Sequence, residues 1–210
     1  MKIDKITVVS DGFVHCRSAF YTSNDLLQGK ITHSLVPGLN QLVGDIDSGA
    51  WAVSYLLSMY KHKKKDFILF DPARITVNGE DMSLSDFSAY SCYIDKSFPL
   101  FSTKKSVKSI VSSELKRRNL DITAEEIKKI FQLSDDRFER PLSGVGNEAY
   151  RAMCAIGYAA GKEVFCFPWL SDCRFEYVKV HIMFVASVLE SLGKIVVLPT
   201  PRARHSQPFC

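Results

Sequence analysis

Long apolar runs, CxxC motifs and metal-type spacings are all absent from this chain of 210 residues. No apolar stretch approaches the roughly 20 residues that a membrane-spanning helix needs. No apolar leader follows Met1, so we expect neither a transmembrane helix nor a signal peptide. The six cysteines form no CxxC pair and no Cys/His zinc spacing. Three of them, Cys92, Cys154 and Cys166, lie in apolar stretches and are typical of buried thiols in a reducing cytoplasm.

Groups of catalytic residues are missing as well. The five histidines are scattered along the chain, and the sequence contains no nucleophile elbow, no zinc motif and no convincing pair of carboxylates. The histidines therefore offer no alternative chemistry.

The composition is that of a folded domain with 46% apolar and 24% charged residues. We predict a single domain over residues 1–210, with a helical subdomain at about 100–145 and a loose tail at about 200–210. The net charge of +4 is mild and spread along the chain, with one dense basic cluster at Lys61–Lys65. That cluster is typical of a solvated helix end, and contact with acidic lipid headgroups or nucleic acid is the alternative.

Short apolar segments alternate with helical patterns through most of the chain. Strands are predicted at 5–10, 30–36, 39–43, 66–70, 75–77, 164–167 and 194–198. Helices are predicted at 50–60, 104–118, 123–131, 146–161 and 177–192, the third with a capping box from Thr123 to Glu126. Fully apolar strands between helices favour an α/β fold with a buried parallel sheet.

The most informative segment runs from Gly44 to Trp51 (GDIDSGAW), after a strand and before a helix. This is the context of a phosphate-binding P-loop, G-x-x-x-x-G-K-[ST]. Gly44 and Gly49 have the required separation, but Ala50 replaces the lysine and Trp51 replaces the magnesium-binding hydroxyl. A turn that needs two glycines for its backbone conformation would explain the pattern equally well.

Further segments follow in a fixed order. Residues 35–44 are similar to the strands and turn before a P-loop, 75–82 to the strand and turn before a Q-loop, and 93–101 to the Q-loop itself, with Asp95 in place of glutamine. Leu142, Ser143, Gly144, Val145 and Gly146 are close to the signature LSGGQ.

The final landmarks complete the series. Residues 164–167 match an apolar Walker B strand, but Pro168 and Trp169 stand where its two acids belong, and 170–172 resemble a D-loop. The region of the switch histidine reads Pro199-Thr200-Pro201. In this order, over about residues 5–202, the chain resembles the nucleotide-binding domain of an ABC transporter. The resemblance implies a P-loop NTPase-like mixed sheet with an inserted helical subdomain.

Each departure from that pattern removes a chemical function. Without the P-loop lysine, the phosphates of ATP lose their point charge. Without a hydroxyl at Trp51 and an acid at Pro168, Mg²⁺ loses both of its usual protein ligands. No carboxylate at Trp169 can orient the attacking water. In addition, Asp45 and Asp47 lie in the phosphate loop beside Ser48, and at a few Å from a triphosphate they would cost on the order of several kcal/mol.

The signature segment is the least altered of these landmarks, since Leu142, Ser143 and Gly144 are retained. In the family it closes over the γ-phosphate that a partner's P-loop holds, which suggests that this chain lends it in trans. Val145 argues against this role, because a Cβ restricts how closely the backbone can approach phosphate. The alternative is that Ser143 only caps the following helix.

The resemblance therefore implies a catalytically inactive, ABC-ATPase-like subunit with no catalytic residues and no metal site of its own. ATP and Mg²⁺ are expected only together with a partner, which is a competent ABC ATPase or a transporter membrane subunit. A heterodimer is expected, a homodimer remains open, and no nucleic acid is expected. The location is cytoplasmic, or peripheral at the inner face of the membrane. The alternatives are a scaffold or regulatory protein of a peptide biosynthesis, export or immunity system, and, ranked last, a residual ATPase.

Overall fold

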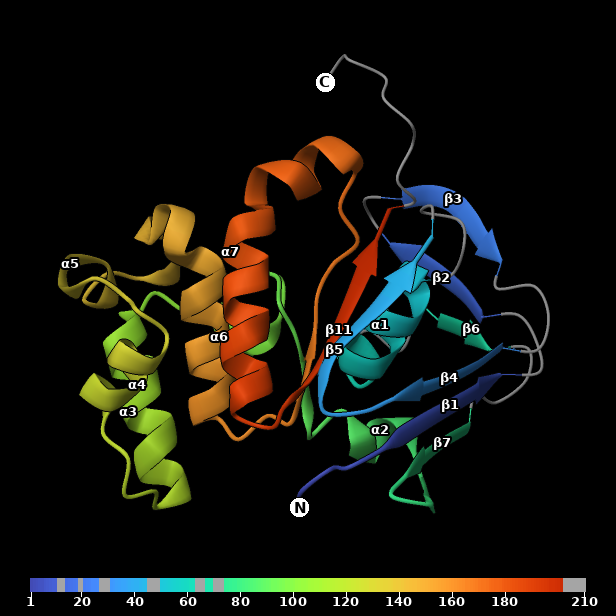
Figure 1. Ribbon diagram of the computed structural model, residues 1–210, viewed down its shortest axis with the longest axis horizontal. Coiled ribbons are helices and arrows are strands. Elements are labelled where there is room, and N and C mark those ends of the chain that lie inside the picture. The colour runs from blue at the N-terminus through green and yellow to red at the C-terminus, as the bar shows by residue number, and fades with distance from the viewer. Residues whose placement is uncertain are drawn as a thin grey trace.

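The computed structural model of the chain describes residues 1–10, 14–18, 21–26, 31–44, 50–62, 67–69 and 74–201. The described strands form three sheets that gather around helix α1, and a block of helices forms the other side of the molecule (Figure 1). Among these residues no helix is both long and apolar enough to span a bilayer.

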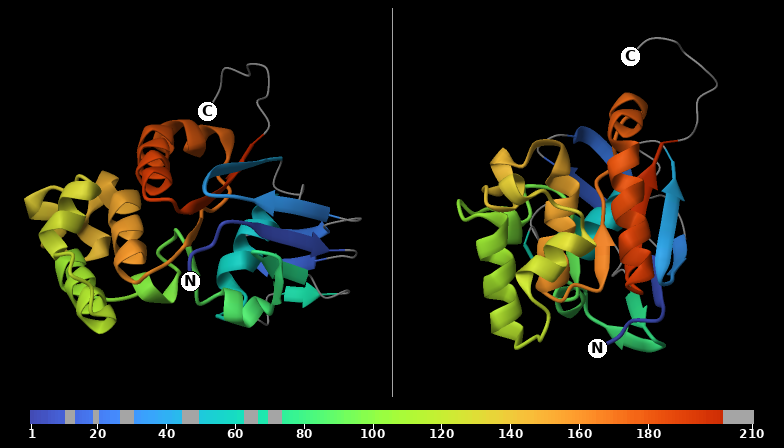
Figure 2. Two further views of the ribbon diagram at one scale, coloured as in Figure 1. Left: turned by 60° about the horizontal axis from the view of Figure 1, so that its bottom comes forward. Right: turned by 60° about the vertical axis from the view of Figure 1, so that its left-hand side comes forward.

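The central sheet is fully parallel, in the order β5-β11-β10-β9. Its strands are β5 (Gly38–Val43), β9 (Ser91–Tyr93), β10 (Val164–Cys166) and β11 (Ile195–Thr200). Every residue of β9, β10 and β11 is buried, because helices cover both faces of the sheet. Helix α1 (Ala50–Met59) packs on β9, β10 and β11, and α7 (Asp172–Ser191) packs on β5 and β11 from the other side (Figure 2). The predicted buried parallel sheet is confirmed.

Two antiparallel sheets complete the β part. The first has the order β4-β1-β7-β8 and the second the order β3-β2-β6. Their strands are β1 (Ile6–Ser10), β2 (Val14–Ser18), β3 (Tyr21–Leu26), β4 (Ile31–Leu35), β6 (Phe67–Leu69), β7 (Arg74–Val77) and β8 (Glu80–Met82). Asn78 and Gly79 join β7 to β8 with φ angles of 53° and 90°, as a two-residue hairpin of this twist requires. The Asn78 side-chain oxygen also accepts hydrogen bonds from the N–H groups of Asp4 and Lys5, at 2.8 and 3.0 Å.

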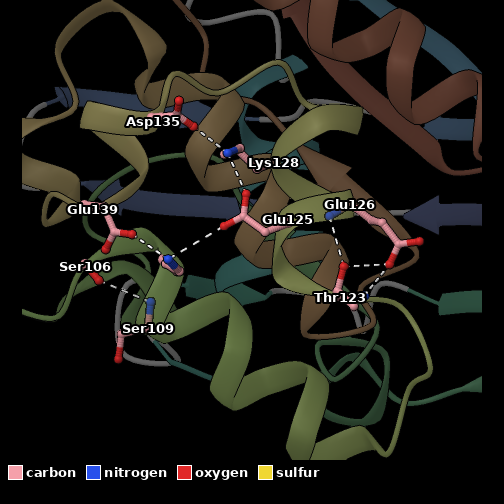
Figure 3. Close-up of polar contacts among 9 residues, drawn as sticks. Ser106, Ser109, Thr123, Glu125, Glu126, Lys128, Asp135 and Glu139 are labelled. Atoms are coloured by element: carbon pink, nitrogen blue, oxygen red, sulfur yellow. Dashed lines mark hydrogen bonds and ion pairs between the residues drawn. The ribbon is translucent and has the colours of Figure 1, made fainter.

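The helical block lies between β9 and β10 in the sequence. It contains α3 (Val107–Arg118), α4 (Ala124–Ile130), α5 (Asp135–Phe138), the 3₁₀ turns η3 (Leu142–Gly144) and η4 (Gly146–Glu148), and α6 (Ala149–Ala159). Two shorter elements precede it, α2 (Leu84–Phe87) and η2 (Pro99–Phe101). Side chains cap its helices: Ser106 accepts from the N–H of Ser109 at 3.2 Å, and the capping box of Thr123 and Glu126 is present as predicted (Figure 3).

Ion pairs join the surface of this block. Figure 3 shows Lys128 between Glu125 and Asp135, each with an N···O distance of 2.5 Å. These carboxylates raise the pKa of Lys128 to about 12, chiefly through the hydrogen bond to Asp135. Because both carboxylates are exposed, we assign the pairs little stability and read them as fixing how α4 and α5 meet.

Several element boundaries differ from the predicted ones. Helix α7 begins at Asp172 rather than 177, because Ser171 in an extended conformation starts the helix earlier. Helix α6 begins at Ala149 rather than 146, because Gly146 adopts a φ of 64° that a helix does not allow. Strand β11 extends to Thr200 and includes Pro199, whose missing N–H is tolerated where β10 has already ended.

Candidate functional site

The chain leaves three parallel strands at the same edge of the central sheet. Gly44 follows β5, Ile94 follows β9 and Phe167 follows β10. Backbone hydrogen bonds hold this edge together: Gly44 donates to Thr200 at 2.9 Å, Phe167 to Val197 at 2.8 Å and Ile94 to Cys166 at 2.8 Å. The structure therefore brings the start of the predicted phosphate loop, the Q-loop segment and the end of the Walker B strand to one edge.

Only the two ends of the predicted phosphate loop belong to the described residues. Gly44 is buried at the end of β5, and Ala50 is the first residue of α1. The predicted site residues Asp47, Ser48 and Gly49, together with Asp45, lie outside the described residues.

Trp51, at the position of the magnesium-binding hydroxyl, is part of the hydrophobic core. Its side chain is only 2% exposed. The indole stacks on Tyr55, with ring centroids 5.1 Å apart, and its Nε1–H donates to the Tyr93 hydroxyl at 3.3 Å. Tyr55 in turn meets the edge of the Tyr93 ring at 5.3 Å. The three rings join α1 to β9 and fill the space between them with apolar surface.

The Walker B positions also carry groups that stabilise the fold. Pro168 and Trp169 are half-buried, and the Trp169 Nε1–H donates to the carbonyl oxygen of Gly44 at 3.0 Å. The Ser54 hydroxyl donates to the carbonyl oxygen of Phe167 at 2.5 Å. These bonds tie the chain after β10 to the start of the phosphate loop and to α1, so polar atoms at this edge are used internally.

Asp95, at the Q-loop position, faces an aromatic neighbour from the helical block. Its carboxylate accepts from the N–H of Ser97 at 2.8 Å and so fixes the turn after β9. The Tyr150 ring stacks on Phe167, with centroids 6.2 Å apart. Burial, and secondly the negative charge of Asp95, raise the pKa of the Tyr150 hydroxyl, while Arg174 opposes the shift. Tyr150, in the first turn of α6, therefore stays a neutral phenol beside the sheet edge.

The switch position contains no titratable group within the described residues. Pro199 and Thr200 are buried in β11, paired with Leu42 and Val43 of β5. Pro201 follows the strand, half-buried. The region where the resemblance led us to expect a switch histidine is a strand end.

The signature segment forms two short turns before α6. Leu142 and Val145 are buried, at 2% and 0% exposure, whereas Ser143, Gly144 and Gly146 are exposed. Gly144 donates its N–H to Pro141 at 2.8 Å, and Val145 donates to Leu142 at 3.4 Å.

Ser143 does not cap α6. That helix begins six residues later at Ala149, with Glu148 as its N-cap residue and no side-chain cap hydrogen bond. Within the described part of the chain, the Ser143 hydroxyl has no hydrogen-bond partner. The alternative of a capping serine is therefore wrong, because the two turns separate Ser143 from the helix.

A pocket of about 360 Å³ opens beside Ser143. It is lined by Lys96, Phe101, Ser102, Thr103, Lys104, Leu142 and Ser143. Phe101 and Leu142 are buried, while the ammonium groups of Lys96 and Lys104 come from exposed residues. No carboxylate lines this pocket, so its polar groups are cationic or hydroxyl groups, which suit an anionic ligand.

The three cysteines expected to be buried are buried. Cys92, Cys154 and Cys166 are free thiols in the core. Burial raises the pKa of the Cys92 thiol to about 12 and raises those of the other two as well. These thiols therefore stay protonated and are poor nucleophiles.

Sequence reasoning missed the side chains that surround the signature and fill the sheet edge. Tyr93 and Tyr150 gave no signal, because an aromatic residue in an apolar run indicates a core position and nothing more. Lys96 lies within the Q-loop segment at 93–101, and Lys104 follows that segment in the sequence. A search for cations near the signature could have found them, but only the fold shows that they share a pocket with Ser143.

Comparison with known proteins addresses the fold. No protein-family profile and no curated protein matches the sequence. A Pyrococcus furiosus protein named as an ABC transporter ATP-binding protein superposes with a TM-score of 0.60 at 12% identity, over 98% of this chain and 94% of that one. A bacterial Atm1-family ABC exporter with ATP bound superposes with a TM-score of 0.60 at 13% identity, over 97% of this chain and 35% of the exporter chain. The chain thus has the mixed α/β fold, with its parallel sheet, of ABC ATPase structures.

Proposed function

We propose that this chain is an ABC-ATPase-like subunit that does not hydrolyse ATP and that acts by pairing with another protein. One observation carries the proposal: the indole of Trp51 occupies core space at the position where the family has its magnesium-binding hydroxyl. A residue that packs the core cannot at the same time present a metal ligand.

The other positions of the site support the same reading. The Trp169 side chain uses its only polar hydrogen on the Gly44 carbonyl, and indole offers no base for a water molecule. Pro168 has neither a charge nor an N–H. Ala50 has no ammonium group to neutralise a phosphate. Loss of four separate groups would cost far more than a residual ATPase could retain, since each contributes several kcal/mol to phosphoryl transfer.

We further propose that the chain lends its signature segment to a partner's nucleotide. The Ser143 hydroxyl is exposed and has no bond to another described residue. The Val145 side chain is fully buried, so the Cβ that argued against this role points into the core. Lys96 and Lys104 add positive charge to the same pocket, which would favour the terminal phosphate of a nucleotide that another chain holds.

A scaffold that uses the fold only for protein contacts is the second candidate. One observation favours the scaffold: the N–H groups of Gly144 and Val145 already form hydrogen bonds within the turn, so they are not available to a phosphate. Under this reading Ser143 has no role in catalysis by any partner.

The two candidates differ in what an arginine at Ser143 would do. The complex of this chain with the ATPase or membrane subunit that co-purifies with it would be assayed for ATP turnover. If Ser143 meets the partner's nucleotide, Ser143→Arg abolishes turnover, whereas Ser112→Arg, at an exposed position of α3, leaves it unchanged. Unchanged turnover with Ser143→Arg, in a complex that still assembles, would support the scaffold instead.

A further inference from the structure

The C-terminal ends of three helices meet at one place. Arg118, the last residue of α3, packs on Gly161 just after α6, and its guanidinium group fills the space that a Cβ at Gly161 would need. Lys162 follows Gly161, and burial lowers the pKa of its ammonium group, with Arg117 and Lys61 adding to the shift. Lys61 lies just after α1. We call Lys61, Lys116, Arg117, Arg118 and Lys162 the basic edge.

The positive charge at the basic edge exceeds the negative charge that the nearby carboxylates and helix ends supply. The nearby carboxylates are Glu114, which binds Arg117 at 2.7 and 3.0 Å, Asp121 after the helix, and Glu163, which pairs with Lys194 at 2.7 Å. Three helix C-termini supply about half a negative charge each, roughly 1.5 in all. Lys162 is half-buried, and its ammonium group already donates to the Ala89 carbonyl oxygen at 2.8 Å. The other four cations are exposed and, because Lys194 offsets Glu163, still outnumber the remaining negative charges. The charge that looks spread along the sequence is thus gathered by the fold.

The basic edge lies opposite the signature segment and opposite the sheet edge that carries Gly44 and Phe167. Helix α6 runs from the signature side at Ala149 to Ala159, so the turn at Gly161 is at its far end. The N–H groups of Glu163 and Val164 bond to Tyr90 where β9 and β10 begin, whereas Gly44 and Phe167 lie where their strands end. A partner that sits on Ser143 therefore leaves the basic edge uncovered.

We propose that the basic edge binds a membrane surface that contains acidic lipids. Leu120 is 39% exposed two residues after Arg118, and the N–H of Leu120 bonds to Leu115, which holds it at the end of α3. A cluster of lysine and arginine beside an exposed aliphatic side chain matches anionic headgroups above an acyl layer. An aliphatic residue offers no stacking surface for bases, so nucleic acid fits less well.

The test uses the full chain with vesicles of phosphatidylcholine alone or of phosphatidylcholine with phosphatidylserine, in a flotation assay. Binding is expected only to the acidic vesicles and is expected to weaken with salt. Each surface cation contributes about fivefold to partitioning, so the double variant Lys61→Gln, Lys116→Gln should bind roughly 25-fold more weakly. The matched control, Lys105→Gln with Lys129→Gln, removes the same charge from exposed lysines elsewhere and should bind as the wild type does.

Leu120→Ser separates insertion from charge. It should weaken binding several-fold at every salt concentration, because it removes apolar contact and leaves the charge intact. Equal binding to neutral vesicles, or an equal loss in the control variant, would overturn the proposal. A third outcome would also overturn it: the chain binds single-stranded RNA but no vesicles, and the double variant Lys61→Gln, Lys116→Gln loses the RNA binding. That outcome would assign the basic edge to nucleic acid.

Discussion

Replacing Trp51 by serine, the residue type that the family has there, should destabilise the fold instead of restoring a metal ligand. The side chain is 2% exposed and stacks on Tyr55. Truncating a buried aromatic residue costs about 3–5 kcal/mol, because the cavity collapses only in part. In a domain of this size each kcal/mol lowers Tm by roughly 2–4 °C, so a loss of about 6–20 °C is expected.

The assay is urea and thermal unfolding followed by circular dichroism. Trp51→Phe keeps a ring against Tyr55 and should cost only about 1–2 kcal/mol. Tyr177→Ala, at a position that is 88% exposed, serves as the control aromatic truncation and should change stability by less than about 0.5 kcal/mol. The reasoning is refuted if Trp51→Ser costs less than about 1 kcal/mol and the variant gains magnesium-dependent ATP binding, because the indole would then cover a preserved site.

Three further substitutions test other parts of the structure. Gly157→Ala places a Cβ 2.9 Å from Phe165 and 3.1 Å from Cys92, so overpacking should cost about 1–3 kcal/mol in urea unfolding, and an unchanged midpoint would contradict the packing of α6. Thr123→Ala removes the capping-box oxygen and should cost about 1 kcal/mol, visible as faster amide exchange in α4. Burial lowers the pKa of His33, so the stability that its neutral form contributes is complete above about pH 6.5 and declines as the pH falls. His33→Gln should therefore reduce the loss of unfolding free energy with falling pH. An equal loss in the variant and the wild type would refute the role of His33.

The sequence pattern predicts best those elements that have a sustained apolar run, clear capping residues or a distinct turn sequence. The parallel strands, α1, α3 and the capping box at Thr123 follow from apolar runs and capping residues. The Asn78-Gly79 hairpin follows from turn chemistry. Strands β2 and β3 were missed, because the polar sequences VHCRS and YTSNDL show neither strong alternation nor an apolar run.

The sequence predicted which chemical groups the candidate site lacks, but it did not predict what the side chains at those positions do instead. Ala50, Pro168 and Trp169 reveal missing groups by comparison with a motif. That Trp51 packs the core, and that Trp169 bonds to Gly44, depends on contacts between residues far apart in the sequence. The pocket beside Ser143 likewise joins residues from 96 to 143, which no local pattern connects.

The central claim is that this chain does not itself bind ATP for hydrolysis, and a titration of the isolated chain with labelled ATP and Mg²⁺ tests it most directly. The account predicts no saturable binding in the micromolar range, because Ala50, Trp51 and Pro168 offer neither an ammonium group nor a metal ligand and the indole of Trp51 lies in the core. Micromolar, magnesium-dependent affinity for ATP would contradict it.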